Sequence, residues 1–169
     1  MTSNFKKNPY ITSLFFLSGL SALLYQIVWQ RVLTQEIGVD SISIAYIVTI
    51  FMIGLGFGSL FGGWFADKYY KNLVYYYAIF EIIIGIFGLF SIDILRISNN
   101  FLINYSVNNL LIEFLLNACV LFVPIFLMGM TTPIIIQFVK NKFSNLGKTI
   151  GWYYGINIIG ASVGSILAL

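Results

Sequence analysis

The stretch of sequence that decides the fold reads Gly54-Leu-Gly56-Phe-Gly58-Ser-Leu-Phe-Gly62-Gly63-Trp-Phe-Ala-Asp67-Lys68 and ends a long apolar run. Gly54, Gly58 and Gly62 are four residues apart, so they lie on one face of a helix. In water, each interior glycine would cost that helix about 1 kcal/mol relative to alanine. In a bilayer, small residues let two helices approach closely and pack. The pattern therefore predicts a membrane helix whose glycine face contacts a neighbouring helix.

The composition is that of an integral membrane protein. Of the 169 residues, 59% are hydrophobic and 9% are charged, and the mean hydropathy is +0.91. A soluble domain has about 25% charged residues. The single cysteine, Cys119, cannot form an intrachain disulfide, and the chain has no histidine, the commonest general base and metal ligand. We expect no catalytic residue, no cofactor, no metal site and no nucleic-acid partner.

Five apolar segments are long enough to cross a bilayer, which takes about 20 residues. We predict an all-α bundle that forms one transmembrane domain over residues 1–169, with spans at about 10–33, 41–65, 73–94, 110–139 and 149–169. Pro124 and Pro133 fall within the fourth span and predict a kink or break there. The first span is longer than a signal-peptide core of about 7–15 residues, so we expect it to remain in the protein.

The lysines predict the orientation in the membrane. They lie before the first span, between the second and third, and between the fourth and fifth, at Lys6, Lys7, Lys68, Lys71, Lys140, Lys142 and Lys148. The positive-inside rule makes this side cytoplasmic, so we expect a cytoplasmic N-terminus in a bacterial plasma membrane. The chain ends in an apolar run, 162–169, which is typical of a fragment of a larger protein; a short natural product is the alternative.

Aromatic residues flank the loop between the second and third spans. Tyr75, Tyr76 and Tyr77 stand at its end. We interpret them as part of the aromatic belt found at headgroup level, in preference to a cation-binding cage, because a cage needs several rings to converge.

Polar groups inside the apolar runs are the candidate functional residues, namely Glu81, Gln26, Arg31 and Asn157. A charged carboxyl at the bilayer centre costs roughly 2–4 kcal/mol, so a carboxyl in a span is a functional candidate by default. Glu81 lies well inside the third span. A functional role and a structural hydrogen bond explain it equally well.

The glycine repeat of the second span returns in the fifth. Gly151 and Gly155 are four residues apart, as are Gly160 and Gly164, and both pairs predict close helix contacts. The segment Gly54–Gly58 superficially matches a glycine-rich nucleotide loop. Such a loop must follow a strand and open a helix, whereas this segment lies inside an apolar run. Helix packing is the interpretation that fits.

The second span ends in a segment, Gly63-Trp-Phe-Ala-Asp67-Lys68-Tyr-Tyr-Lys71, that resembles the loop signature of major facilitator transporters. That signature is a glycine, three residues, an acid, a base and further bases. In that family the acid caps or pairs with a neighbouring helix end and helps to control rocking. The resemblance implies the same loop role for Gly63, Asp67 and Lys68.

Several segments together resemble the membrane region of membrane-bound spermidine-synthase-like proteins, which fuse a major-facilitator-like helical region to a soluble aminopropyltransferase-like domain. In order, the segments are 16–33, 51–63 with 66–68, Glu81 with Gly85, 124–133 and 157–164. The resemblance implies a partial major-facilitator-like unit that anchors or serves polyamine metabolism. Its partners would be the lipid bilayer, further transmembrane helices or a cytoplasmic synthase-like domain.

This chain departs from that family at two points. Gln26 stands where the family's first helix typically has an acid, and no segment supplies the strand-loop-helix site of the aminopropyltransferase. We therefore do not expect this chain to catalyse aminopropyl transfer by itself. Two alternatives stay open: a partial major-facilitator-like transporter of a small cationic solute that uses Glu81, and an oligomerising anchor that uses the glycine faces.

Overall fold

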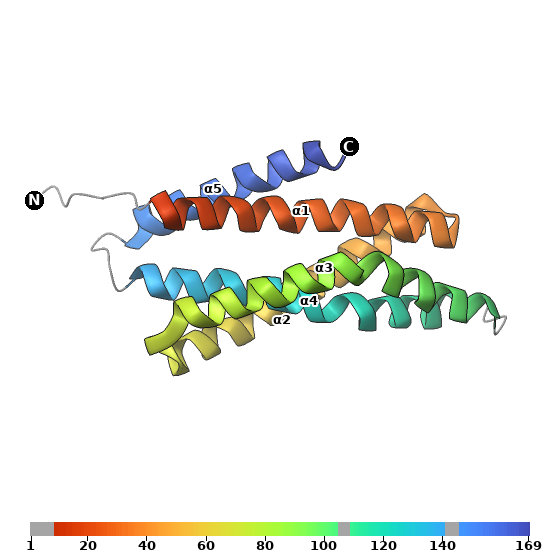
Figure 1. Ribbon diagram of the computed structural model, residues 1–169, viewed down its shortest axis with the longest axis horizontal. Coiled ribbons are helices and arrows are strands. Elements are labelled where there is room, and N and C mark those ends of the chain that lie inside the picture. The colour runs from red at the N-terminus through yellow and green to blue at the C-terminus, as the bar shows by residue number, and fades with distance from the viewer. Residues whose placement is uncertain (1–8, 105–108, 141–145) are drawn as a thin grey trace, which may run out of the picture.

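The computed structural model describes residues 9–104, 109–140 and 146–169, and every element in these residues is helical. In chain order the elements are α1 (Pro9–Ile37), α2 (Asp40–Lys68), the 3-10 helix η1 (Tyr70–Asn72), α3 (Leu73–Asn104), α4 (Leu110–Lys140) and α5 (Leu146–Leu167). The five α-helices are long and apolar enough to cross a membrane and run along one common direction (Figure 1). The predicted all-α membrane bundle is confirmed.

The first four α-helices extend beyond the apolar segments that predict them, whereas α5 both begins and ends earlier than its segment. The largest difference is in α3, which runs to Asn104, whereas its predicted span ends near residue 94. Asn99 lies in the polar extension, and its amide donates to the Leu95 carbonyl at 3.0 Å within the helix. Hydropathy locates only the apolar part of a helix, while backbone and side-chain hydrogen bonds continue it into polar sequence.

Glycine faces join α2 to α4. A Cβ added at Gly54 would lie 2.7 Å from Cγ2 of Ile125, and one at Gly62 would lie 2.7 Å from Cα of Met130. At Gly58, the midpoint, an added Cβ would overlap the carbonyl oxygen of Phe126. These three glycines are buried, and at Gly58 and Gly62 the backbone of α2 lies directly against that of α4.

The first and last helices form a second close pair. Added Cβ atoms at Gly160 and Gly164 of α5 would overlap the carbonyl oxygens of Phe16 and Leu20 on α1. The expectation for Gly151 and Gly155 is wrong: among the described residues, nothing lies within 4 Å of a Cβ added at either position. Small residues permit close packing on a helix face but do not show which stretch of it has a neighbour.

Two units can thus be distinguished in the bundle. The α1–α5 pair lies on one side, and α2, α3 and α4 lie together on the other (Figure 1). Trp29 of α1 is one link between them. Its side chain is 1% exposed. The centre of its ring lies 6.0 Å from the ring centre of Phe51 on α2 and 6.1 Å from that of Phe87 on α3. Its Nε1 donates a hydrogen bond of 2.9 Å to the hydroxyl of Ser91 on α3.

Neither proline interrupts the fourth helix. Pro124 and Pro133 lie inside α4, which is continuous from Leu110 to Lys140, so there is no break. A kink within the continuous helix stays a prediction.

The turn between α1 and α2 uses Gly38, which has a φ of +78°, a left-handed conformation that glycine adopts without strain.

The lysines and the arginines of the described chain lie toward opposite ends of the bundle. The end of α2, the start of α3, the end of α4 and the start of α5 share one end, which we call the lysine end (Figure 1). It carries Lys68, Lys71, Lys140 and Lys148. At the opposite end, Nε of Arg96 lies 4.0 Å from a Glu36 carboxyl oxygen. Lys6, Lys7 and Lys142 lie outside the described residues.

Candidate functional site

Glu81 lies half-buried on α3 at the contact with α1. Its carboxyl lies close to the hydroxyls of Tyr77 and Ser18. Tyr77 is four residues before Glu81, which places both on one face of α3, and Ser18 comes from α1. A carboxyl in the apolar part of a bundle therefore has two polar neighbours, one from each helix.

Tyr25 extends this cluster along α1. It is seven residues after Ser18, on the same helix face, and its side chain is close enough to Glu81 for an electrostatic interaction. Its ring rests on Gly88 of α3, where an added Cβ would lie 2.5 Å from Cζ of Tyr25. Gly88 thus makes room for the tyrosine. We call Ser18, Tyr25, Tyr77 and Glu81 the Glu81 cluster.

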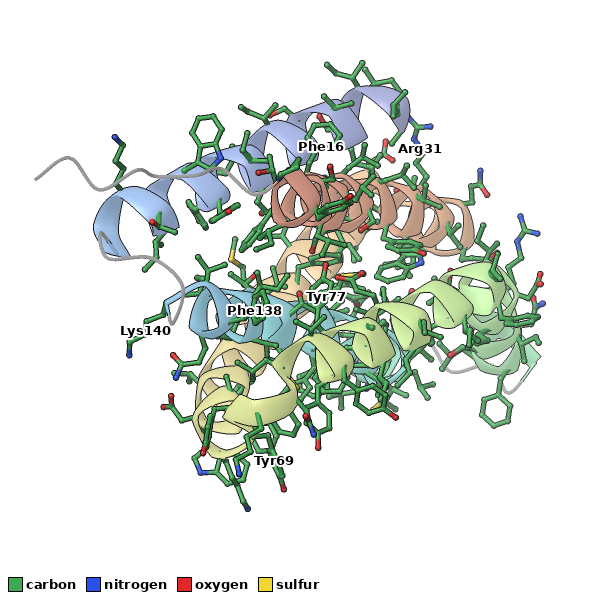
Figure 2. All side chains as sticks on the ribbon, turned by 60° about the vertical axis from the view of Figure 1, so that its left-hand side comes forward. Phe16, Arg31, Tyr69, Tyr77, Phe138 and Lys140 are labelled. Carbon is green, nitrogen blue, oxygen red and sulfur yellow. The ribbon has the colours of Figure 1, made fainter. Side chains whose placement is uncertain are left out.

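Tyr77 departs from the aromatic belt in which the sequence interpretation places it. Its exposed fraction is 5%, whereas that of Tyr75 is 65%. In Figure 2, Tyr77 is directed into the bundle, while Tyr69 lies at the outer edge of the lysine end. The belt interpretation fits Tyr75 and is wrong for Tyr77, because α3 turns this residue toward α1.

An apolar cavity of about 220 Å³ lies between α1, α3 and α4 beside the Glu81 cluster. Tyr77 belongs to both the cavity and the cluster. The cavity is lined mainly by aliphatic and aromatic side chains: Tyr10, Ile11, Leu14, Leu73, Val74, Tyr77, Ile134, Ile135 and Phe138. These residues come from the halves of the three helices nearest the lysine end, so the cavity lies between that end and Glu81.

The other predicted polar residues do not converge on Glu81. Nη2 of the exposed Arg31 donates to the Leu169 carbonyl at 3.2 Å, and Nδ2 of Asn157 donates to the Phe15 carbonyl at 3.0 Å. The Asn157 bond joins α5 to α1, and the Arg31 bond joins α1 to the residues just after α5. Gln26 is half-buried on α1, and no hydrogen bond from its side chain is found within the described part of the chain.

The loop signature lies at the lysine end, away from the Glu81 cluster. Oδ1 of Asp67 accepts a hydrogen bond of 2.9 Å from Nε2 of Gln137, which ties the end of α2 to α4. Nζ of Lys68 lies 4.8 Å from the centre of the Trp64 ring. Gly63 is half-buried, and an added Cβ there would meet nothing within 4 Å among the described residues.

Sequence reasoning missed a polar contact between α3 and α4. Asn99 and Asn117 are buried and face each other, with reciprocal amide contacts of 3.4 and 3.3 Å. Each also donates to a carbonyl one turn earlier in its own helix. The sequence shows that each helix carries an asparagine. It does not show that the two pair, because the pairing depends on how α3 and α4 are rotated relative to each other.

The chemistry that this arrangement permits is that of a single carboxyl. It can exchange a proton or pair with one cation, and the hydroxyls around it can orient either one. Among residues 9–104, 109–140 and 146–169, no three His, Cys, Asp or Glu side chains come together as metal ligands would.

No protein-family model, curated protein or solved structure matches this chain. The site is therefore interpreted from its own residues.

Proposed function

We propose that this chain is the membrane domain of a spermidine-synthase-like protein and that its Glu81 cluster receives an aliphatic polyamine. One observation carries the proposal: the Glu81 carboxyl lies beside two hydroxyls where α1 meets α3. The ordered motifs that resemble the family's membrane region support it. In this proposal the lysine end is cytoplasmic, the membrane is a bacterial plasma membrane, and aminopropyl transfer is left to a synthase-like domain.

A polyamine has the chemistry that this site would favour. It consists of ammonium groups separated by short alkyl chains. A carboxylate inside the membrane pairs favourably with one ammonium, because either charge alone is costly there. The apolar cavity of about 220 Å³ beside Tyr77 suits the alkyl chain. The tyrosine ring can also attract a cation.

Binding of labelled spermidine to the purified protein in nanodiscs tests this proposal. Glu81→Gln keeps the size of the side chain and removes its charge, so we expect affinity to fall by at least about tenfold. Glu113→Gln is the matched control, since it removes a half-buried carboxyl from the first turn of α4, at the opposite end of the bundle. Equal binding by the native protein and Glu81→Gln would overturn the proposal.

A second candidate is a partial major-facilitator-like transporter of a small cationic solute. It is favoured by the position of Glu81 at the contact between the α1–α5 pair and the other three helices. Rigid bodies that rock around a central polar site are the usual basis of alternating access. A carboxyl at such a contact would be able to bind the solute or a proton both when the site opens to the cytoplasm and when it opens to the outside.

Uptake of labelled spermidine into proteoliposomes separates the two candidates. Binding that depends on Glu81 without uptake supports the first, and uptake abolished by Glu81→Gln supports the second.

The oligomerising-anchor alternative loses its main surface, because Gly58 is covered by α4 and Gly160 by α1 within a single chain.

A further inference from the structure

We propose that a second site, at the lysine end, binds the phosphate of an anionic phospholipid. It is a surface cavity of about 320 Å³ formed where α2 ends, η1 turns and α3 begins. Its lining is Lys68, Tyr69, Tyr70, Lys71, Asn72 and Tyr76, and we call it the lysine–tyrosine cavity. It is separate from the Glu81 cluster and does not depend on the function proposed for that cluster.

The lysine–tyrosine cavity carries two positive charges, and within the described part of the chain neither Lys68 nor Lys71 forms an ion pair with an acidic side chain. The ion pair between Arg96 and Glu36 lies at the opposite end. The nearest acid in sequence, Asp67, is held by the neutral amide of Gln137 at 2.9 Å. The hydrogen bond directs this carboxylate toward α4, which leaves Lys68 and Lys71 available to an external anion.

The donors in the cavity suit a phosphate group. The two ammonium groups supply charge, while tyrosine hydroxyls and the Asn72 side chain supply hydrogen bonds. Nζ of Lys68 lies 4.8 Å from the Trp64 ring centre and 5.5 Å from that of Tyr69, and Nζ of Lys71 lies 5.9 Å from the Tyr70 ring centre. The rings hold the ammonium groups near the cavity by cation–π attraction.

The exposed aromatic and apolar side chains next to the cavity favour a lipid over a soluble anion. Trp64 and Tyr70 are more than half exposed, as residues of an interfacial aromatic belt are. Leu60, Trp64 and Lys68 are four residues apart on one face of α2, and Leu60 is 75% exposed. A lipid could place its phosphate at the lysines and an acyl chain along this apolar stripe.

Native mass spectrometry of delipidated protein, titrated with phosphatidylglycerol or phosphatidylcholine, tests the proposal. In Lys68→Gln/Lys71→Gln we expect the affinity for phosphatidylglycerol to fall by about tenfold or more, because each lysine near a membrane surface contributes substantially to binding anionic lipid. Lys140→Gln/Lys148→Gln removes the same charge from the end of α4 and the start of α5, at the same end of the bundle, and should retain binding. Lys140 and Tyr69 lie well apart in Figure 2.

Two outcomes of that titration would overturn the proposal. The first is an equal loss in both double variants, which would mean only general charge attraction. The second is displacement of phosphatidylglycerol by millimolar inorganic phosphate, which would mean a site for a soluble anion.

Gln137 provides an independent check of the charge mechanism. In Gln137→Leu, the Asp67 carboxylate loses its partner and becomes free to neutralise Lys68, so binding of phosphatidylglycerol should weaken although both lysines remain. Adding Asp67→Asn to this variant should restore binding. A loss that Asp67→Asn does not restore would contradict the proposal, since a charge effect must be reversed when the charge is removed.

Discussion

Tyr77 determines what surrounds the Glu81 carboxyl. Its ring is buried against α1, and its hydroxyl is one of the two polar neighbours of that carboxyl. The ring and the hydroxyl therefore have separate roles. The ring packs between helices, while the hydroxyl orients the carboxyl or its ligand.

Tyr77→Phe separates these roles. Because the ring is kept, we expect the free energy of unfolding to change by no more than about 1 kcal/mol. We expect spermidine affinity in nanodiscs to fall, since one donor beside Glu81 is lost. Tyr75→Phe, at a residue 65% exposed, is the control and should leave both quantities unchanged. Unaltered affinity in Tyr77→Phe would remove Tyr77 from the site.

The Asn99–Asn117 contact should contribute through the pair rather than through either residue. Replacing one asparagine with leucine leaves the other amide buried without its partner across the interface. Replacing both leaves no orphaned amide. We expect a coupling of about 1 kcal/mol between the two substitutions, the usual size for hydrogen bonds between membrane helices. A double-mutant cycle measured by unfolding in detergent provides the value, and simple additivity would contradict it.

Glu81 illustrates which part of a site can be recognised from sequence. A carboxyl within an apolar run is conspicuous because of its solvation cost. Ser18, Tyr25 and Gly88 are not conspicuous, since hydroxyls and small residues are common in membrane helices. Their role depends on the rotation of α1 against α3, which a single sequence does not encode in any simple pattern.

At the scale of the helix, the α2–α4 contact rests on the absence of side chains. Gly58→Ala would place a Cβ against the backbone of α4, where no flexible side chain can move away. We expect a loss of about 1–3 kcal/mol in stability, as for other overpacked interfaces. Gly56→Ala is the matched control, because nothing described lies within 4 Å of its added Cβ. Thermal unfolding in detergent should show no loss for Gly56→Ala; equal losses would contradict the contact.

The glycine spacing of α5 was informative in one half of the helix only. Gly160 and Gly164 contact α1, whereas Gly151 and Gly155 have room for a Cβ. The same spacing occurs in both halves, so the difference comes from the position of the neighbouring helix.

The length of α3 shows a similar limit, since polar residues such as Asn99 continue a helix that hydropathy alone would end.

At the scale of the whole molecule, the bundle consists of two units with few contacts between α4 and α5. We expect α5 to move more relative to α4 than α2 does. Spin labels at Val123 of α4 paired with Leu60 of α2 should give a narrow distance distribution in a Cys119→Ser background. Labels at Val123 and Ile158 of α5 should give a broader one. All three positions are exposed, so labelling leaves the core intact. Equal widths would contradict the division into two units.

The separation of lysines from arginines makes the orientation testable. In the same Cys119→Ser background, Arg96→Cys should react with a membrane-impermeant maleimide on intact cells. Lys71→Cys should react only after the cells are permeabilised. These outcomes follow from a cytoplasmic lysine end. The reverse pattern would invert the orientation, and with it the leaflet in which the lysine–tyrosine cavity meets lipid.

Because α1 packs against α5, its main partner is the last of these helices to leave the ribosome. α1 ends at Ile37 and α5 begins at Leu146, so α2, α3 and α4 are synthesised in between. The backbone carbonyls of Phe16 and Leu20, which α5 covers in the finished bundle, must meanwhile face lipid or the insertion machinery. A nascent chain stalled before α5 would expose this surface to membrane quality-control proteases. Arrival of α5 would therefore be the step that covers this surface of α1.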